Sequence, residues 1–184
     1  WVAFPVACLN MMAAYLPSHD AQHDSYARPG DKLRWLNEWI GHSSALLLAY
    51  SYRVLRETHL EHHKHTNKDQ LYPDYVFNDE DSAWKAMANT IGSFQPSSAS
   101  AKSYENTLQR LDTPNARRGL LDQLIIFLCH TAFLFIMAAN GFALETFLLW
   151  WLPLKIGVLY LRFYLSWAPH QGAKRLLREL VRIP

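Results

Sequence analysis

The chain has 184 residues and a formal net charge of +2 at pH 7, and its length suits a single domain. Half of the residues are hydrophobic and only 18% are charged, which argues against a disordered chain or a nucleic-acid-binding protein. The two cysteines, Cys8 and Cys129, are too few for a disulfide framework or a thiolate metal site, so any metal is expected to be held by nitrogen and oxygen.

The first apolar stretch covers residues 1–17, where only Asn10 is strongly polar. It is slightly shorter than the roughly 20 residues that a membrane-spanning helix needs. We therefore predict that residues 1–17 are part of a transmembrane helix. The chain opens inside this stretch without a methionine, and we expect that sequence is missing at both ends of the chain.

Residues 39–55 form a second, shorter apolar stretch, which is interrupted by His42, serines and Arg53. Its composition alone does not decide whether this stretch crosses a membrane or lies at its surface. The long segment 56–116 that follows is hydrophilic. The serine-rich piece within it, GSFQPSSASAKS, is typical of a flexible surface loop.

Two long apolar stretches follow, at residues 120–139 and 142–166, separated only by Asn140-Gly141. Each is long enough to cross a bilayer, and the short turn between them permits only an antiparallel hairpin. Two core helices of a globular protein are the alternative, but such helices normally carry a polar stripe at 3.6-residue spacing. We therefore predict a transmembrane hairpin, in which the charge of Lys155 needs a polar partner or cavity.

The lysines and arginines predict the orientation of this hairpin. Twelve of the eighteen lie between Arg28 and Arg118 and four follow Ser166, whereas the Asn140-Gly141 turn has none. Positive residues favour the cytoplasmic side. The polar loop and the C-terminal tail are therefore expected in the cytoplasm, with the turn outside.

Histidines are the outlier of the composition, because six of the nine fall into two short clusters. The first is His19-Asp-Ala-Gln-His23, whose i, i+4 spacing places both imidazoles on one face of a helix. The second is His59-Leu-Glu-His62-His63, followed by Lys-His65, in which i, i+3 and i+4 again share a face. A lone histidine pair is commonly a solvated surface feature. So many rings packed together are electrostatically unfavourable unless something binds them, which favours a metal site.

The number of histidines narrows the choice of metal. Imidazole alone accepts zinc, copper, iron or nickel. Five clustered histidines without cysteine exceed the ligand set of one tetrahedral zinc, so two ions are expected, with redox-active iron the sensible candidate. Such ligands need hydrogen-bond acceptors behind them. The candidates for that role are Asp20, His65, Asn67 and Asp74.

The motifs H-D-A-Q-H and H-L-E-H-H-K-H-T-N-K-D, with Tyr72-Pro73-Asp74 after them, resemble the first two histidine boxes of the membrane fatty acid desaturase superfamily, which includes carotenoid ketolases and hydroxylases. The segment 163–170, ending at His170, resembles the stretch that precedes the third box in many bacterial members. The resemblance implies a non-haem di-iron centre that activates O2. It also implies the metal ligands His19, His23, His59, His62 and His63, with His170 as a further candidate.

The third box of that superfamily, another H-x-x-H-H, is absent from the sequence. We therefore expect residues 1–184 to be a single partial desaturase-like domain that lacks some of the metal ligands. We also expect this piece alone to be inactive.

The shared site constrains the topology. If residues 39–55 crossed the membrane, about 30 Å of hydrocarbon would separate the two clusters. This segment is therefore predicted to be an interfacial or re-entrant helix. The sequence thus predicts an all-α integral membrane protein with transmembrane helices, an interfacial helix and a cytoplasmic histidine-box region.

The leading functional hypothesis is an O2-dependent, membrane-bound di-iron oxygenase that acts on lipid and receives electrons from a ferredoxin or cytochrome. Acyl desaturation is favoured because of the second box and the Thr66-Asn67 that follows it. Carotenoid ketolation or hydroxylation and alkane or fatty acid hydroxylation are alternatives within the same superfamily. A non-catalytic membrane protein that binds zinc or copper is an alternative of another class, and a di-haem protein is disfavoured because His130 has no obvious partner.

Overall fold

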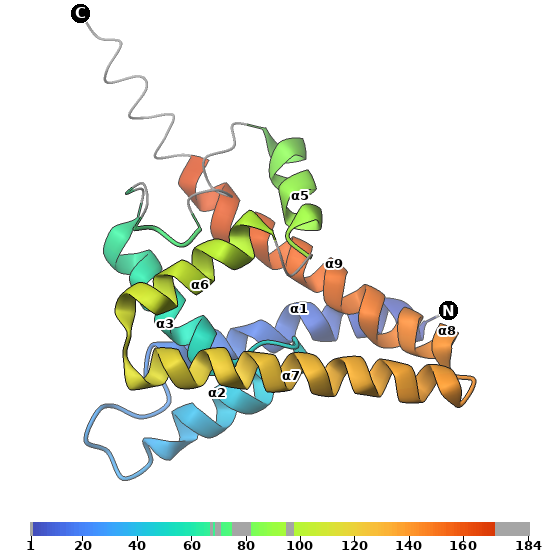
Figure 1. Cartoon of the computed structure of the whole chain (residues 1–184), viewed down its shortest axis with the longest axis horizontal. Coiled ribbons are helices and arrows are strands. Elements are labelled where there is room, and N and C mark those ends of the chain that lie inside the picture. Colours follow the sequence, from blue (N-terminus) through green and yellow to red (C-terminus); the bar gives the residue numbers. More distant parts are fainter. Residues whose placement is uncertain (1, 67, 69–70, 75–81, 95–97, 172–184) are drawn as a thin grey trace, which may run out of the picture.

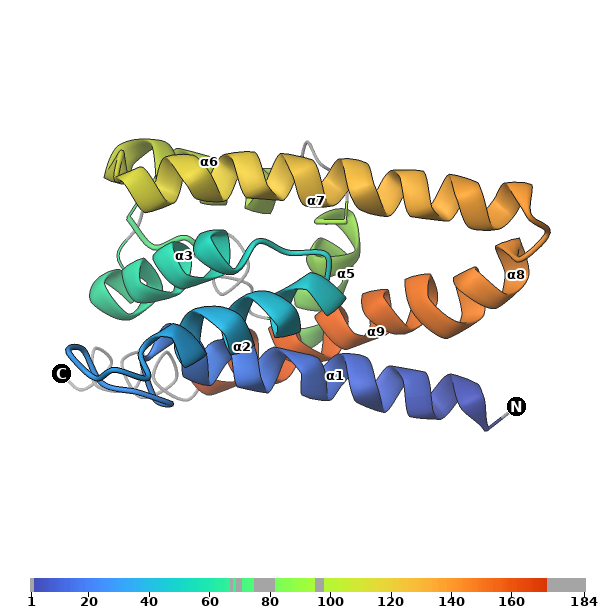
Figure 2. The same ribbon diagram turned by 90° about the horizontal axis from the view of Figure 1, so that it is seen from below.

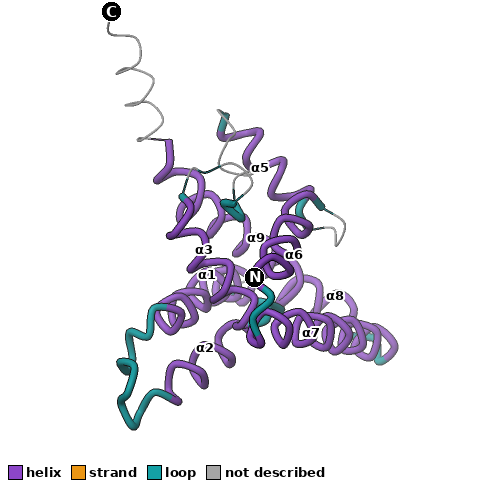
Figure 3. The backbone as a smooth tube through the Cα atoms, turned by 60° about the vertical axis from the view of Figure 1, so that its left-hand side comes forward, coloured by secondary structure: helices purple, strands orange, loops and turns teal. Residues whose placement is uncertain are grey.

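The computed structural model describes residues 2–66, 68, 71–74, 82–94 and 98–171. Within these residues every regular element is helical and no strand is present (Figure 3). The helices are α1 (Ala3–Gln22), α2 (Trp35–Leu47), α3 (Tyr52–His65), α5 (Ala83–Gly92), α6 (Ala99–Leu111), α7 (Pro114–Ala139), α8 (Ala143–Thr146) and α9 (Leu152–Leu161), with π-helical turns η1 (Phe147–Trp151) and η2 (Arg162–Trp167).

The long helices run side by side along the longest axis of the molecule (Figures 1 and 2). α7 runs in one direction. The chain from α8 to η2 runs in the direction opposite to α7 and lies beside α1. The turn between α7 and α8 lies at one end of the molecule, and the C-terminal ends of α1, α3 and η2 gather at the other end. This arrangement brings three distant parts of the sequence together at one end of the fold.

Among the described residues, two helices are long and apolar enough to cross a membrane, by length and composition. They are Pro114–Ala139, with a mean hydropathy of 2.0, and Ala143–Gln171, with a mean hydropathy of 1.4. No residue in the most apolar window of the first helix is fully buried inside the protein, although one side of it contacts the second helix, where the His130 and Phe133 rings lie against Trp150. Gly141 closes the turn between them with φ +85°, a left-handed conformation that favours glycine.

Local sequence signals explain how this hairpin begins and bends. Thr113 caps α7 by accepting a hydrogen bond from the backbone N–H of Ala116, and Pro114 occupies the first turn, where its missing N–H costs nothing. In the second helix, Pro153 lies two residues after the end of η1. Proline lacks the N–H that a regular helix requires, which accounts for a locally wider turn before it.

α1 extends from Ala3 to Gln22 and so reaches beyond the predicted stretch 1–17 to include His19. It packs along α2 and α9. Its position inside a membrane stays a prediction, because α1 is not among the two helices that meet the length and hydropathy criteria.

The prediction of one helix over residues 39–55 is wrong. The structure has two helices there, α2 and α3, which run in opposite directions (Figure 2). Ala49 adopts a left-handed conformation with φ 59°, and the Ser51 side chain then accepts a hydrogen bond from Val54 N–H to start α3. α2 therefore runs along α1, and α3 returns in the direction opposite to α2.

Tyr52 and Gln123 hold the turn between α2 and α3, and Gln123 of α7 accepts from the backbone N–H of Ser51 and donates to the backbone oxygen of Ala49. Tyr52 is buried, and its hydroxyl donates to the backbone oxygen of Ala21, 2.9 Å away. The ring lies so close to Gly41 that a Cβ at that position would overlap it. Glycine is thus required where α2 meets the start of α3.

The expectation of a flexible surface loop in the serine-rich piece of segment 56–116 also needs correction. The described part of this segment contains α5 and α6, and α6 begins inside the serine-rich piece, where Ser98 accepts a hydrogen bond from Ala101 N–H. α6 packs against α3 and α7 through a small buried cluster of Val54, Leu108 and Ala116. α6 was not predicted as a helix because its few apolar residues stand among many polar ones.

Candidate metal centre

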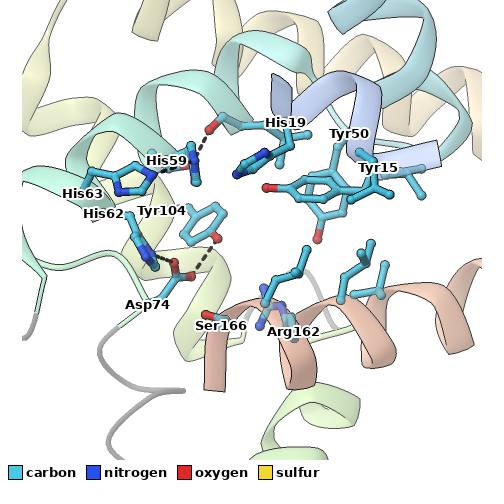
Figure 4. A pocket seen from close by; sticks show the side chains of 17 residues that line it. Tyr15, His19, Tyr50, His59, His62, His63, Asp74, Tyr104, Arg162 and Ser166 are labelled. Carbon is cyan, nitrogen blue, oxygen red and sulfur yellow. Dashed lines mark hydrogen bonds and ion pairs between the residues drawn. The ribbon is translucent and has the colours of Figure 1, made fainter. Parts of the chain in front are cut away.

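The two histidine clusters, 36 residues apart in sequence, meet in space. α1 ends at Gln22, so His19 lies in its last turn and His23 directly follows it. α3 places His59 opposite them, with His23 Nε2 and His59 Nε2 2.9 Å apart. His63 Nε2 lies 3.0 Å from His59 Nε2 on the next turn of the same helix (Figure 4). Four imidazoles thus point their ring nitrogens into one small space.

Three of these residues have the spacing of a metal-binding group. One ligand atom each from His19, His23 and His59 all lie within 4.8 Å of one another. Imidazole nitrogens that bind one ion at about 2.0–2.1 Å, as in zinc sites, are separated by roughly 3 Å. The N···N distances of 2.9 and 3.0 Å are therefore compatible with a shared ion. The residues present fit a metal held by nitrogen.

His62, which also lies on α3, has a different partner. Its Nδ1 donates to Asp74 Oδ2 at 2.7 Å, and Tyr104 of α6 donates its hydroxyl to the other carboxylate oxygen at 2.8 Å (Figure 4). A carboxylate that accepts from Nδ1 fixes the tautomer and leaves Nε2 as the available ligand atom. The ring centroid of His62 lies 5.7 Å from that of His59, so the two sets of rings are adjacent.

His170 reaches this second set from the end of the last helix. Its ring centroid lies 5.5 Å from that of His62, and Tyr72 OH lies 3.2 Å from its Nε2. The histidines therefore form two neighbouring groups. One consists of His19, His23, His59 and His63, and the other of His62 and His170.

Two ion pairs connect the histidine-bearing segments to their surroundings. Arg56, one turn before His59, binds Asp24, directly after His23, with 2.8 Å between Nη2 and Oδ2. Both side chains are mostly buried, at 19% and 20% exposed. On the opposite face of α3, the buried Glu61 binds Arg110 of α6 at 3.0 Å. Both sides of α3 are thus held in register.

Burial and mutual repulsion favour the neutral form of three imidazoles, those of His59, His63 and His23. Burial, together with repulsion from the neighbouring His19, His63, His62 and His23, lowers the pKa of His59 to about 3. Burial also lowers the pKa of His63 and of His23, again with help from nearby histidines. A metal ligand must be the neutral form of histidine. The lowered pKa values of His59, His63 and His23 therefore favour the protonation state that metal binding requires.

A cavity of about 280 Å³ opens beside the histidines (Figure 4). One wall carries imidazoles and the opposite walls carry aromatic and aliphatic side chains from α1, α9 and the α2–α3 turn, with Arg162 and Ser166 of η2 between them. The apolar lining consists of Tyr15, Leu16, Leu48, Tyr50, Leu55, Tyr104, Val158, Leu161 and Leu165. Apolar walls with a few convergent polar groups are typical of ligand pockets.

The structure separates the residues expected to support the ligands. Asp20 lies 3.5 Å from His19 Nδ1 and is exposed, and Asp74 is bonded to His62. His65 instead lies 3.5 Å from Glu61. Positions 61 and 65 are one helical turn apart, which accounts for this contact. Asn67 lies outside the described residues.

Sequence reasoning missed Tyr104 and Arg56. Tyr104 sits 30 residues after Asp74, in a segment predicted to be a loop, and nothing in its local pattern marks it. Arg56 could have been noticed, because it lies on α3 three residues before His59 and an acidic residue directly follows His23.

The fold and the site together define a helical protein with a histidine cluster at one end of two membrane-length helices. The family model for fatty acid desaturases matches residues 1–182, and the chain belongs to this family. The resemblance seen in its histidine motifs is thereby confirmed. No solved structure matches the chain.

Curated relatives fall into two kinds of lipid-modifying enzyme. The chain is 35% identical over 88 residues to the sn-1 oleoyl-lipid 12-desaturase of Anabaena variabilis, covering 46% of this chain and 21% of that protein. It is 33% identical over 81 residues to the sn-1 acyl-lipid omega-3 desaturase (ferredoxin) of Nostoc sp. (strain 36), covering 40% and 21%. It is 36% identical over 62 residues to the zeaxanthin 4-ketolase of Chlamydomonas reinhardtii, covering 33% and 13%. The matches thus span about a fifth or less of each relative's length.

Proposed function

We propose that this chain forms part of a membrane-bound, O2-dependent di-iron oxygenase that acts on lipid, with acyl desaturation as its reaction. The observation that carries the proposal is the convergence of histidines from α1, α3 and the last helix beside a cavity with apolar walls. A lipid chain is the ligand that such walls suit. The acyl-lipid desaturases among the relatives support the same reaction.

The proposed ligands are His19, His23, His59, His62 and His63, with His170 as a sixth. Iron bound there would supply the oxygen-activating redox chemistry that the family resemblance implies. The protein's own contribution is positional. Asp74 holds His62 in one tautomer, Asp20 lies beside His19, and the apolar walls orient the alkyl chain and exclude water.

The membrane topology belongs to the proposal. α7 and Ala143–Gln171 would cross the bilayer as a hairpin with α1 beside them, and the α2–α3 pair would be re-entrant. The histidines then lie on the side opposite the Asn140–Gly141 turn. The lysine and arginine distribution supports a cytoplasmic position for that side. An electron carrier would reach the site there, and the Nostoc relative, named as a ferredoxin enzyme, favours a ferredoxin over a cytochrome.

The competing functions separate by metal content and product. The full-length protein, purified from membranes, should contain two irons and show no Soret band. Zinc or copper in place of iron would support a non-catalytic metal-binding protein, and haem would support a b-type protein. Incubation with O2, a reduced ferredoxin and a lipid substrate should yield a new double bond. A hydroxylated or keto product would instead support the alternative that the zeaxanthin 4-ketolase relative suggests.

A further inference from the structure

α5 has an exposed apolar strip that no described part of the chain covers. Trp84 is 79% exposed and Ile91 57% exposed, and Ala88 between them is exposed as well. The opposite face of the helix is buried against the protein at Ala86 and Thr90. The Thr90 hydroxyl donates to the backbone oxygen of Ala86 at 2.9 Å, so this polar group is satisfied within the helix.

The exposed part of α5 is divided into two sectors. At about 100° per residue, Ile91, Trp84 and Ala88 fall next to one another on the helix surface. Lys85 and Asn89, also exposed, lie together along the neighbouring strip. The helix therefore presents three sides, which are a protein-facing side, an apolar side and a polar side. A helix at a membrane surface has this division, with its apolar side in the acyl region and its charged side in water.

The place of α5 in the fold fits the same interpretation. α5 contacts α9 and η2, which belong to the second membrane-length helix. Just beyond its end, the Phe94 ring lies 4.6 Å from Lys155 Nζ, close to the middle of Ala143–Gln171. α5 also runs roughly crosswise to α7 in two perpendicular views (Figures 1 and 2). If α7 crosses a bilayer, α5 lies along the membrane plane.

We propose that α5 is an in-plane membrane helix whose apolar strip (Trp84, Ala88 and Ile91) is covered by lipid. This inference rests on the proposed membrane insertion of α7 and Ala143–Gln171. The bilayer is favoured as the occupant because α5 contacts α9 and η2, which are parts of the proposed membrane-crossing helix Ala143–Gln171. Tryptophan is also the residue enriched at the level of lipid headgroups. The hydrophilic segment between the second histidine cluster and α7 is thus partly membrane-bound.

Spin labels on single cysteines test this directly. The full chain, with Cys8→Ala and Cys129→Ala, would be labelled at Ala88→Cys or Ile91→Cys and reconstituted in phosphatidylcholine–phosphatidylglycerol vesicles. Collision rates with O2, which concentrates in lipid, and with a water-soluble nickel chelate would be measured by EPR. A label at Lys85→Cys is the matched control on the polar side of the same helix. A label at Phe135→Cys, on α7 and 72% exposed, reports lipid for the hairpin.

Labels at positions 88 and 91 are expected to collide severalfold more with O2 than with the chelate, as at position 135, with the reverse ratio at position 85. Labels at 88 and 91 that favour the chelate would place the strip in water and overturn the inference. Immobile labels reached by neither reagent would show that protein covers the strip, which would overturn it as well. If the label at position 135 also favours the chelate, the membrane topology in the proposed function fails together with this inference.

Discussion

The ion pair between Arg56 and Asp24 is predicted to set the spacing of the two histidine clusters. Its atoms are 2.8 Å apart and its side chains are about four-fifths buried. Asp24→Asn preserves the size and the left-handed backbone of this position, φ 54°, because asparagine tolerates that conformation. It removes the charge and leaves the Arg56 guanidinium without its carboxylate. Because Asp24 directly follows His23, the loss should loosen His23 relative to His59.

The magnitude lies between two limits. Breaking a fully buried pair costs about 3–5 kcal/mol, and an exposed pair contributes about 0–1 kcal/mol. A pair with one-fifth of its side-chain surface exposed should therefore lower the free energy of unfolding by about 1–3 kcal/mol. Residues that orient metal ligands also typically change metal affinity by about 10–100-fold. We expect iron affinity in the full-length Asp24→Asn protein to fall within that range.

A second aspartate provides a matched control. Asp112 is also left-handed, with φ 44°, and also pairs with an arginine, Arg117, at 3.3 Å, but its side chain is 69% exposed. Asp112→Asn should therefore leave both properties nearly unchanged. Iron retained after dialysis against increasing chelator concentrations, together with thermal unfolding in detergent, measures the two effects. Equal losses in the two variants would refute the argument that the buried pair positions the cluster.

Three further outcomes are expected. His62→Ala in the full-length protein should abolish iron loading and turnover while the hairpin stays inserted, as metal analysis and protease protection would show; retained activity would count against the site. Asp74→Asn should weaken iron binding by about 10–100-fold, and Tyr104→Phe, which removes only the hydrogen bond behind Asp74, should cost less; chelator titration ranks the two, and the reverse order would contradict the chain of contacts. Gly41→Ala should destabilise the protein by about 1–3 kcal/mol because its methyl overlaps the Tyr52 ring; an unchanged melting temperature would show that the ring moves freely.

The histidine site was predictable because its information is local. The spacing of His19 and His23, and of His59, His62 and His63, fixes which rings share a helix face, and the need for one common site placed the clusters on one side of the membrane. The structure brings the clusters together as expected from that spacing. The same periodicity places His65 one turn after Glu61, which it contacts.

The features that were predicted wrongly depend on tertiary contacts. The break after α2 follows from a left-handed Ala49 and the insertion of Tyr52 against Gly41, and neither has a clear sequence signal. α6 reads as polar because only a narrow strip of it, including Leu108, is buried. Tyr104 depends on that placement, so its contact with Asp74 was equally hidden.

The turn at residues 48–51 has a consequence for how this chain tolerates insertions. Two segments that contribute ligands to one site must lie on the same side of the bilayer. The chain between them must therefore cross the bilayer an even number of times. In the proposed topology α2 and α3 together make no crossing, so His59, His62 and His63 stay on the same side of the bilayer as His19 and His23. In that topology a few added residues in α2 would not make it cross the bilayer, whereas an extension long enough to make it traverse would carry His59 to the far leaflet and dismantle the cluster.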